Sequence, residues 1–470
     1  MKTYFWLTIA GVLLVVAGFT AIGANTALAQ EPVAEDPPFL ADYYNAWMSS
    51  PHADASAEAF NHWNSDGEVP VECARCHSTP GYIDYLGGDG SDAGVVDAPA
   101  PIGTVITCDA CHNPAASNLT SITFPSGVEV PATSDGARCM VCHQGLESGV
   151  SLLAALEDSG MTADMNLPNP EIGFINIHYR PAAAVLYGGV AHGGFEYAGM
   201  AYAVHNEHVE GMNTCADCHD PHTAEVQVAA CSTCYEGVET VEDLRDIRME
   251  GSLVDFDGDD DDLEGIYYEI DGLQELLYEA IQAYASEVAG SPIVYDLHSY
   301  PYFFIDTNDD GEVTEGEAIY PNKYASWTGN LLAAAYNYQV VQKDPGGYAH
   351  NAMYLIQLMY DSITQLNTEI STPIDMEYAS RNPHGHFNSN AEAFRHWDAD
   401  GAVPGTAGVS GEQHQYRRAA LLIAELHDLP HRPGGLHDLR SRHGDVPQRR
   451  KGQLWRRRRE QSVPHLPSGP

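Results

Sequence analysis

The sequence predicts a fold whose N-terminal part is mostly irregular and short-helical, followed by an α-helical domain, with little β structure. Two patterns in the 470 residues lead to this prediction. Residues 71–143 are rich in Gly, Pro, Asp and Ser and show no sustained apolar period, whereas three later segments repeat apolar residues at three- and four-residue steps. A third pattern, in the cysteines, indicates what holds the irregular part together.

All ten cysteines fall into five Cys-x-x-Cys pairs, and histidine directly follows four of these pairs. This is the attachment signature of c-type haem, in which two thiols bond to the porphyrin and the histidine reaches the iron. A disulfide framework and a zinc site are weaker alternatives, because neither requires that histidine. The expected thioether cysteines are Cys73, Cys76, Cys108, Cys111, Cys139, Cys142, Cys215 and Cys218, and the expected proximal iron ligands are His77, His112, His143 and His219.

The fifth pair, Cys231 and Cys234, is followed by Tyr235 instead of histidine. We interpret this as a proximal ligand lost by a single base change. A tyrosine-ligated, catalytic haem, as in catalase, is a second interpretation, and a disulfide between the two cysteines is a third. The sequence therefore predicts four covalent c-type haems, or five if this pair also attaches one.

A second axial histidine would make each iron six-coordinate and suited to electron transfer, whereas an open position favours catalysis or ligand binding. Histidines outside the motifs are more numerous than four irons require. Our first choices for distal ligands lie near aromatic or structured sequence: His62, His178, His222 and His350. The next candidates are His52, His192, His205 and His208.

Residues 1–29 have the features of an export signal: Lys2, an apolar core and the small-x-small site Ala27-Leu28-Ala29. No later segment has the length and apolarity of a membrane span. The formal net charge is −44, and residues 1–404 hold only 10 of the 22 basic side chains but 60 of the 66 acidic ones. Such a body repels nucleic acid and anionic membrane surfaces. We expect a periplasmic, extracellular or cell-surface protein whose partners are other redox proteins, with self-association left open.

The motifs divide the chain into segments. After the signal, 30–144 forms a three-haem module, and 145–240 a module with the fourth motif and the degenerate fifth pair. Residues 241–380 form a helical domain that serves as scaffold or haem cover, with helices expected at 263–288, 324–341 and 351–366.

Within the helical domain, residues 306–317 match the twelve-residue calcium loop, with Gly311 at position 6 and a glutamate at position 12. A solvated acidic turn is the alternative. The candidate calcium ligands are Asp306, Asn308, Asp310, Glu312 and Glu317. The acidic run 255–262 is a weaker cation candidate, because it lacks the glycine and the terminal glutamate at this spacing.

Residues 57–70 match 391–404 at ten of fourteen positions, so we expect 381–404 to begin a repeated haem module. No cysteine follows the second copy, and residues 405–470 are rich in Arg, His and Pro without periodicity. Codons that encode 426–431 and 463–468 can encode Cys-Thr-Thr-Cys-His and Cys-Pro-Thr-Cys-His when read one nucleotide later. We interpret 405–470 as a frameshifted, disordered tail in preference to a basic interaction tail.

Several short motifs resemble those of exported polyhaem c-type cytochromes of anaerobic bacteria, over roughly residues 50–404. They include Ala-Glu-Ala-Phe-x-His-Trp, Cys142-His-Gln-Gly145, Asn176-Ile-His-Tyr179 and Cys218-His-Asp-Pro-His222. The resemblance implies closely spaced, bis-histidine haems that relay electrons across or outside the envelope. It also implies a haem at 231–235 and further haems beyond residue 404.

Electron transfer without substrate chemistry is thus the leading hypothesis, and an enzymatic role is left open. One alternative is a multihaem reductase that acts on a small oxyanion at an open iron, although the acidic body would repel anions. The other is a non-haem, disulfide-linked, calcium-binding surface protein.

Overall fold

The computed structural model describes residues 38–209, 211–248 and 254–383. All of them fall within the first of the two units into which the chain divides, Met1–Val403. The predicted export signal, nearly all of the repeated module at 381–404 and the tail 405–470 lie outside the described residues.

Short helices carry the cysteine motifs, as the sequence predicts. Each Cys-x-x-Cys pair lies in a helix or begins in one and continues into the next turn. The helices of this part are α2 (Pro38–Met48), α3 (Glu58–Asn61), α4 (Val71–His77), α5 (Thr79–Tyr85), α6 (Cys108–Cys111), α7 (Pro114–Ser117), α8 (Ser134–Met140), α11 (Cys215–Cys218) and α12 (Val228–Cys231).

The junction between α4 and α5 illustrates how this short-helical part is built. Ser78 ends α4 and caps α5, because its hydroxyl accepts the backbone N–H of Gly81 at 3.0 Å. A Cβ atom at Gly81 would lie 2.4 Å from the carbonyl oxygen of Ala74. Only glycine therefore allows the two helices to pack this closely.

The strands of the described residues form three two-stranded antiparallel sheets, and two isolated β-bridges lie outside them, which confirms the prediction of little β structure. The strands are β1 (Glu68–Val69) with β2 (Ala100–Pro101), β3 (Ser121–Thr123) with β4 (Glu129–Pro131), and β5 (Ile293–Tyr295) with β6 (Phe303–Ile305). In register, Val69 faces Ala100, Ile122 faces Val130, and Val294 faces Phe304.

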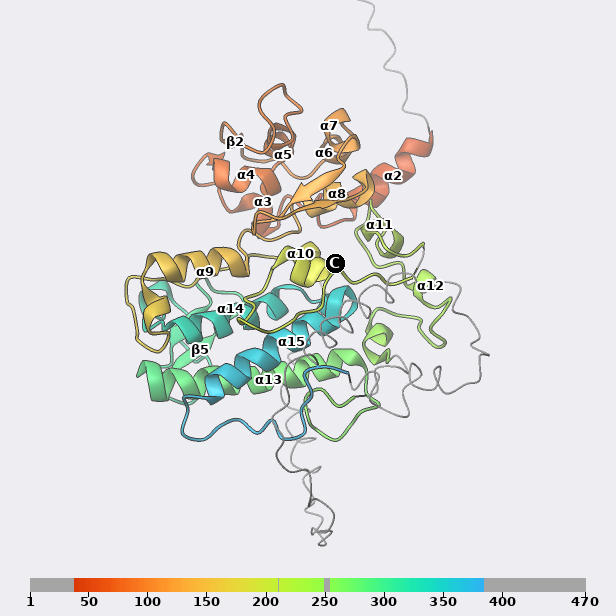
Figure 1. Cartoon of the computed structure of the whole chain (residues 1–470). Helices are drawn as coiled ribbons and strands as arrows, with labels where there is room; N and C mark the ends of the chain where they lie inside the picture. The colour runs from red at the N-terminus through yellow and green to blue at the C-terminus, as the bar shows by residue number, and fades with distance from the viewer. Residues whose placement is uncertain (1–37, 210, 249–253, 384–470) are drawn as a thin grey trace, which may run out of the picture. The chain divides into compact units, whose positions relative to one another are not determined.

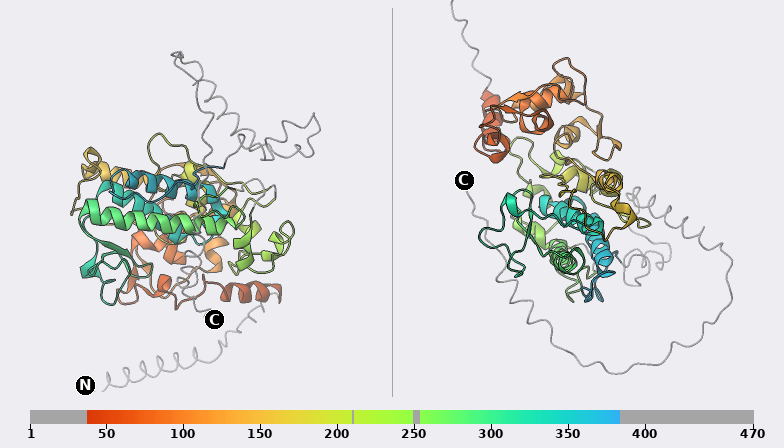
Figure 2. Two further views of the ribbon diagram at one scale, coloured as in Figure 1. Left: turned by 90° about the horizontal axis from the view of Figure 1, so that it is seen from below. Right: turned by 90° about the vertical axis from the view of Figure 1, so that its left-hand side faces the viewer.

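Three long helices pack side by side in the C-terminal part of the described chain (Figures 1 and 2). They are α13 (Ile266–Tyr284), α14 (Gly329–Lys343) and α15 (Gly347–Asn367). The expected helix at 324–341 starts later, because the hydroxyl of Thr328 accepts the N–H of Leu331 and caps α14. The other helical segments are α9 (Gly149–Asp158), α10 (Ala182–Ala191), the 3₁₀ turns Met161–Ala163, Glu242–Asp246 and Tyr320–Asn322, and the π turn Ala285–Ala289.

The largest hydrophobic core surrounds α14, a helix that is buried on nearly every side. This core includes Leu277 of α13, Leu358 of α15 and Trp327, which precedes α14. All three side chains are fully buried. Residues before the expected domain boundary at 240 also belong to it, among them Leu152 and Val185. The hydrophobic core is therefore built from residues on both sides of residue 240.

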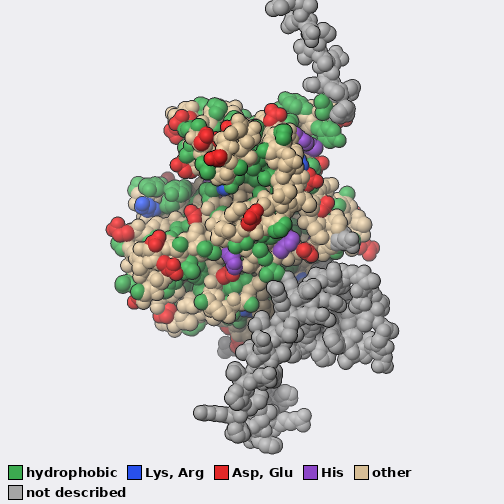
Figure 3. All heavy atoms as spheres, turned by 45° about the horizontal axis from the view of Figure 1, so that its top comes forward, with side chains coloured by type: hydrophobic (Ala, Val, Ile, Leu, Met, Phe, Trp, Pro, Cys, Tyr) green, Lys and Arg blue, Asp and Glu red, His purple; other side chains and the backbone are tan. Residues whose placement is uncertain are grey.

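The surface of the described part carries scattered Asp and Glu side chains with few Lys or Arg side chains among them on the face drawn in Figure 3. This agrees with the acidic composition of the chain before residue 405. Among the residues that the structure describes, no helix combines the length and apolarity needed to cross a membrane.

Candidate haem sites

The structure places a second histidine ring opposite each of the four motif histidines. The separations between ring centres fall in a narrow range, 5.9 to 6.5 Å. The pairs are His77 with His178 at 5.9 Å, His112 with His222 at 6.2 Å, His143 with His52 at 6.2 Å, and His219 with His350 at 6.5 Å.

This separation fits a metal ion between the two rings. An imidazole nitrogen binds a metal at about 2 Å, so two imidazoles on opposite sides of one ion have ring centres about 6 Å apart. Imidazole rings that packed directly on one another would not need to keep nearly the same separation of ring centres in four different surroundings. The donor sets therefore fit bis-histidine iron at all four Cys-x-x-Cys-His motifs.

The local backbone explains how His178 reaches the first motif. His178 has a left-handed backbone with φ 79°, a conformation that histidine adopts more readily than most residues. The side chain of Asn176 accepts the N–H of His178 at 2.8 Å and holds this turn. The carbonyl of the intervening Ile177 accepts the N–H of Leu146, which ties the segment to the end of the third motif.

A break in α15 positions His350 opposite the fourth motif. Asn351 has the non-helical angles φ −165° and ψ 77°, and its amide donates to the carbonyl of Val204 at 2.8 Å. Asn206 in turn donates to the carbonyl of His350 at 2.8 Å. Gly188 is needed at this contact, because a Cβ atom there would lie 2.4 Å from the carbonyl oxygen of Ala203.

Three of the eight paired rings have an oxygen acceptor at Nδ1. The carbonyls of Ala59 and Arg180 accept from His77 at 2.8 Å and from His143 at 3.2 Å. The buried carboxylate of Asp344 accepts from His350 at 2.8 Å. A carbonyl oxygen can only accept, so the proton lies on Nδ1 and Nε2 remains available for a metal, as in most protein metal sites.

Removal from water keeps most of these rings neutral, and a histidine must be neutral to bind a metal. Partial burial lowers the pKa of His143 and of His178 to about 4, with the partner histidine of each pair as the second cause. Partial burial also lowers the pKa of His52, His77 and His219. At His350, burial lowers the pKa but the carboxylate of Asp344 outweighs it, and the net pKa is raised.

Cysteines of different motifs lie near one another. The thiol of Cys142 donates to the carbonyl of Arg75, the residue before Cys76, at 3.6 Å. Helix α8, which carries Cys139, packs against α11, which begins at Cys215. In space the third motif therefore lies next to both the first and the fourth motifs.

The structure brings some candidate distal ligands to the motifs and leaves others elsewhere. His178, His222, His350 and His52 face motif histidines, whereas His62 is 58 % exposed and pairs with Glu58 at 2.8 Å. The other candidates have different partners. His192 contacts Glu196, His205 stacks on Tyr187 at 4.1 Å, and His208 faces Tyr235.

Sequence reasoning ranked His62 above His52, because His62 adjoins a tryptophan in the repeated segment. In the structure that tryptophan, Trp63, packs against the ring of His77 at 5.1 Å, while the partly exposed ring of His62 packs on Trp63 and pairs with Glu58. The N–H of Ile106, just before the second motif, donates to the carbonyl of His52 at 3.1 Å and helps to anchor it. No sequence pattern around His52 predicts this contact, because it joins residues that are 54 positions apart.

Internal hydrogen bonds close the calcium-type loop at residues 306–317. Asp306 accepts the N–H groups of Asp309 at 2.7 Å and Gly311 at 2.8 Å. Glu317 accepts the N–H groups of Thr307 and Thr314, which lowers the pKa of its carboxyl group to about 2 and keeps it ionised. The other candidate ligands, Asn308, Asp310 and Glu312, lie between these two carboxylates on the same loop.

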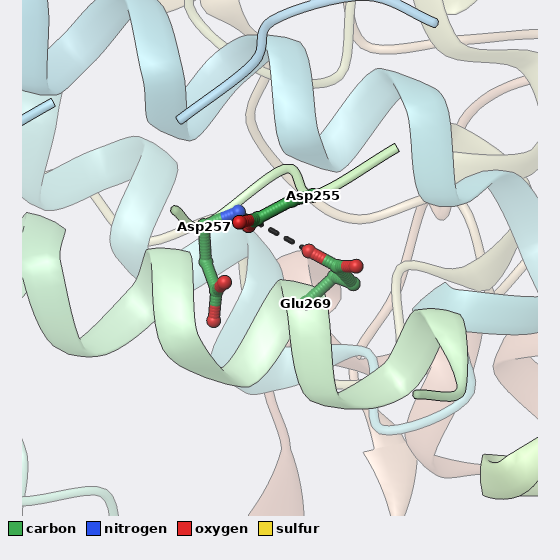
Figure 4. Close-up of side chains that lie close together, drawn as sticks. All are labelled: Asp255, Asp257 and Glu269. Atoms are coloured by element: carbon green, nitrogen blue, oxygen red, sulfur yellow. Dashed lines mark hydrogen bonds between the residues drawn. The ribbon is translucent and has the colours of Figure 1, made fainter. Parts of the chain in front are cut away.

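A separate acidic cluster forms where residues 255–259 meet α13. Within the described residues, carboxylate oxygens of Asp255, Asp257 and Glu269 lie within 4.8 Å of one another. Figure 4 shows Glu269 directed at this loop, where it accepts the N–H of Asp257 at 3.2 Å. Glu269 is also ion-paired with Arg248 at 2.9 Å, so this carboxylate already has partners that anchor the loop. Sequence reasoning missed Glu269, because it lies on the helix and outside the acidic run.

Comparison with known proteins gives relatives of one kind. The chain is 26 % identical over 425 residues to the C-type polyheme cytochrome OmcB of Geobacter sulfurreducens, an alignment that covers 77 % of this chain and 52 % of the relative. It is 26 % identical over 391 residues to the C-type polyheme cytochrome OmcC of the same organism, which covers 70 % and 48 %. The chain spans about half the length of the curated relatives it matches. No protein-family model and no solved structure matches it.

Proposed function

Because this chain is a relative of the polyhaem c-type cytochromes, we propose that it transfers electrons through four covalently attached haems whose irons have two histidine ligands each. The observation that carries the proposal is the constant spacing of the four histidine pairs. Each haem would supply a one-electron couple. The chain's own residues would hold it by two thioether bonds and two imidazoles.

The order of electron transfer follows from the contacts between motifs. Cys142 of the third motif donates to the carbonyl next to Cys76 of the first, and the helix that carries Cys139 packs against the helix of the fourth motif. Motifs this close together would place the attached porphyrin edges near each other. We propose that electrons pass between the first and fourth motifs by way of the third.

We place the haem of the second motif beside this route. Cys111 lies close enough to both cysteines of the third motif to raise their pKa values electrostatically. The route would therefore branch at the third motif, which would make it the central site of the relay.

The alternative of a reductase is less well supported at these four motifs. A reductase needs an iron with an open axial position, and each motif histidine here faces a second histidine. The acidic surface would also disfavour an anionic substrate. The partners of an electron carrier would be other redox proteins, and the export signal expected at 1–29 favours a site of action outside the cytoplasm.

Loop 306–317 would bind one calcium ion as a structural accessory. Its support is the match to the twelve-residue loop together with the ionised Glu317, whose low pKa comes from backbone and threonine donors. The ion would fix the segment between β6 and α14 and take no part in electron transfer.

Replacement of single histidines tests the bis-histidine proposal, with the protein produced in a host that matures c-type cytochromes. His178→Ala should convert one low-spin iron to high spin in the low-temperature EPR spectrum, because it removes one of two strong ligands. His62→Ala is the matched control, since the structure pairs that exposed ring with Glu58.

Intact mass of the same preparations gives the number of haems attached. Four or more haems with only low-spin iron at the four intact motifs would support the proposal. A high-spin signal caused by His62→Ala and not by His178→Ala would show that the pairing is wrong. Absence of covalent haem would refute electron transfer altogether.

A further inference from the structure

Two adjacent buried residues of opposite charge, Lys343 and Asp344, lie where α14 ends; they are 3 % and 4 % exposed. The ammonium nitrogen of Lys343 lies over the ring of Tyr179 at 3.9 Å and over the ring of Tyr302 at 4.0 Å. It also donates to the carbonyl of Leu297 at 3.3 Å. These contacts favour the charged form of the lysine. Among the described residues Lys343 forms no ion pair, so no carboxylate cancels its charge.

Each of these two charges lies beside a different histidine pair. Tyr179, whose ring Lys343 covers, follows His178 in the chain, and the rings of Tyr179 and His178 are 5.1 Å apart. After burial and the facing motif histidine, the charge of Lys343 is the next cause that lowers the pKa of His178. Asp344 instead accepts from Nδ1 of His350 at 2.8 Å, and His350 faces the fourth motif. The cation is therefore close to the first motif and the anion to the fourth.

Two arginines extend this contrast in a chain that holds only 10 basic side chains in residues 1–404. Arg75 lies within the first motif, and its charge also lowers the pKa of His178, though less than burial does. At the third motif burial is the largest cause for His143, but charges of both signs also act there, because Arg180 lowers its pKa and Asp344 raises it. At the fourth motif burial lowers the pKa of the motif histidine and Asp344 opposes it. Along the proposed route the surroundings therefore change from cationic at the first motif to mixed at the third and anionic at the fourth.

We propose that these buried charges give the sites of the relay different electron affinities, highest at the first motif, intermediate at the third and lowest at the fourth. This inference rests on the proposed function. Reduction would add one electron, taken from a reduced partner protein, and thus one negative charge at a site, which a nearby cation favours and a nearby anion disfavours. No covalent bond forms or breaks in this step. A single electron would rest at the first motif, so electrons would enter at the fourth motif and leave at the first.

A redox titration of the full-length, haem-loaded protein tests the inference once the first motif can be followed separately. His178→Met provides that separation, because methionine in place of a histidine ligand raises the potential of the iron. In this background, Lys343→Met should shift the separated wave to a more negative potential, equivalent to about a tenfold lower electron affinity. Lys343→Arg keeps the charge and should leave the wave in place. The titration is made at pH 6, where Lys343 is charged, because burial lowers its pKa only to about 8.

Lys323→Met is the matched control and should not move the wave, because Lys323 also lies over a tyrosine ring, at 4.9 Å, but is not among the causes that shift the pKa of His178.

Titration of the chain with His178 intact tests the order of the sites. The wave that Asp344→Asn raises should lie at a lower potential than the wave that Lys343→Met lowers. The reverse order, an unmoved wave in Lys343→Met, or an equal shift in Lys343→Met and Lys343→Arg would overturn the inference, while covalent low-spin haems would still support the relay. Absence of covalent haem would instead refute the proposed function.

Discussion

The two halves of the described chain are stabilised in different ways. The three long helices α13, α14 and α15 enclose a core of large side chains, including Trp327, Tyr336 and Tyr354, each fully buried. The segment that carries the first three motifs has only small clusters in which alanines such as Ala74 and Ala110 are prominent. The comparison teaches that side-chain packing stabilises the helical half, whereas the motif half lacks an equivalent core, so we expect it to depend on its proposed haems.

The largest expected effect is the loss of structure in the motif half when haem is not attached. Covalent cofactors substitute for a missing core in the way that other covalent or metal staples do in small domains. In protein made without haem attachment, amide hydrogen exchange should show α4, α6 and α8 unprotected, while α13, α14 and α15 keep strong protection. If α8 were as well protected as α14 in haem-free protein, the contrast between the two halves would be wrong.

The second prediction weakens the helical half directly. Leu277→Ala removes a fully buried side chain from α13 and should lower the free energy of unfolding by about 2–5 kcal/mol. Chemical denaturation followed by far-UV circular dichroism measures the change. Leu263→Ala is the control, because Leu263 is 71 % exposed and its loss should cost less than about 0.5 kcal/mol. Haem number should stay the same in both variants, and a loss of haem in Leu277→Ala would mean that the halves do not behave separately.

The third prediction concerns Asp344, whose side chain contacts the proposed haem ligand His350. Its carboxylate accepts from Nδ1 of His350 and makes that imidazole a stronger donor, which favours ferric iron. Asp344→Asn should therefore raise the reduction potential of one haem by on the order of tens of millivolts. Spectroelectrochemical titration detects the shift. The control is Asp375→Asn, because Asp375 is an exposed carboxylate that accepts the N–H of Glu377 in its own loop. This change should leave every haem reduction potential unchanged.

The smallest expected effect is that of calcium on the helical half. Calcium should raise the melting temperature of this half by a few degrees, because a ligand that binds only the folded state stabilises it by about 1 kcal/mol or more once it exceeds its Kd. Glu317→Gln should abolish the rise, which differential scanning calorimetry measures. Asp309→Asn should preserve it, because Asp309 occupies a non-ligand position and its φ of 58° suits asparagine. Equal calcium responses in both variants would exclude Glu317 as a ligand.

The helix boundaries show how far local sequence rules reach. The apolar period predicts all three long helices, since a helix that packs on a core must repeat its apolar side every three to four residues. It places the start of α14 too early, because Tyr324 and Trp327 belong to the same core without being helical. Thr328, the residue that caps the helix, gives the true start. Apolar residues show what is buried, and capping residues show where a helix begins.

The sequence by itself predicts the chemistry of attachment, because the Cys-x-x-Cys-His spacing brings two thiols and an imidazole close together along the chain. It also determined the helical core and the calcium-type loop, both of which arise from neighbouring residues. Only the tertiary structure decided which histidine faces each motif, as with His52 in place of His62, and that the third motif lies next to both the first and the fourth. The physical reason is that these contacts join residues tens of positions apart, whose distances depend on the packing of the whole chain.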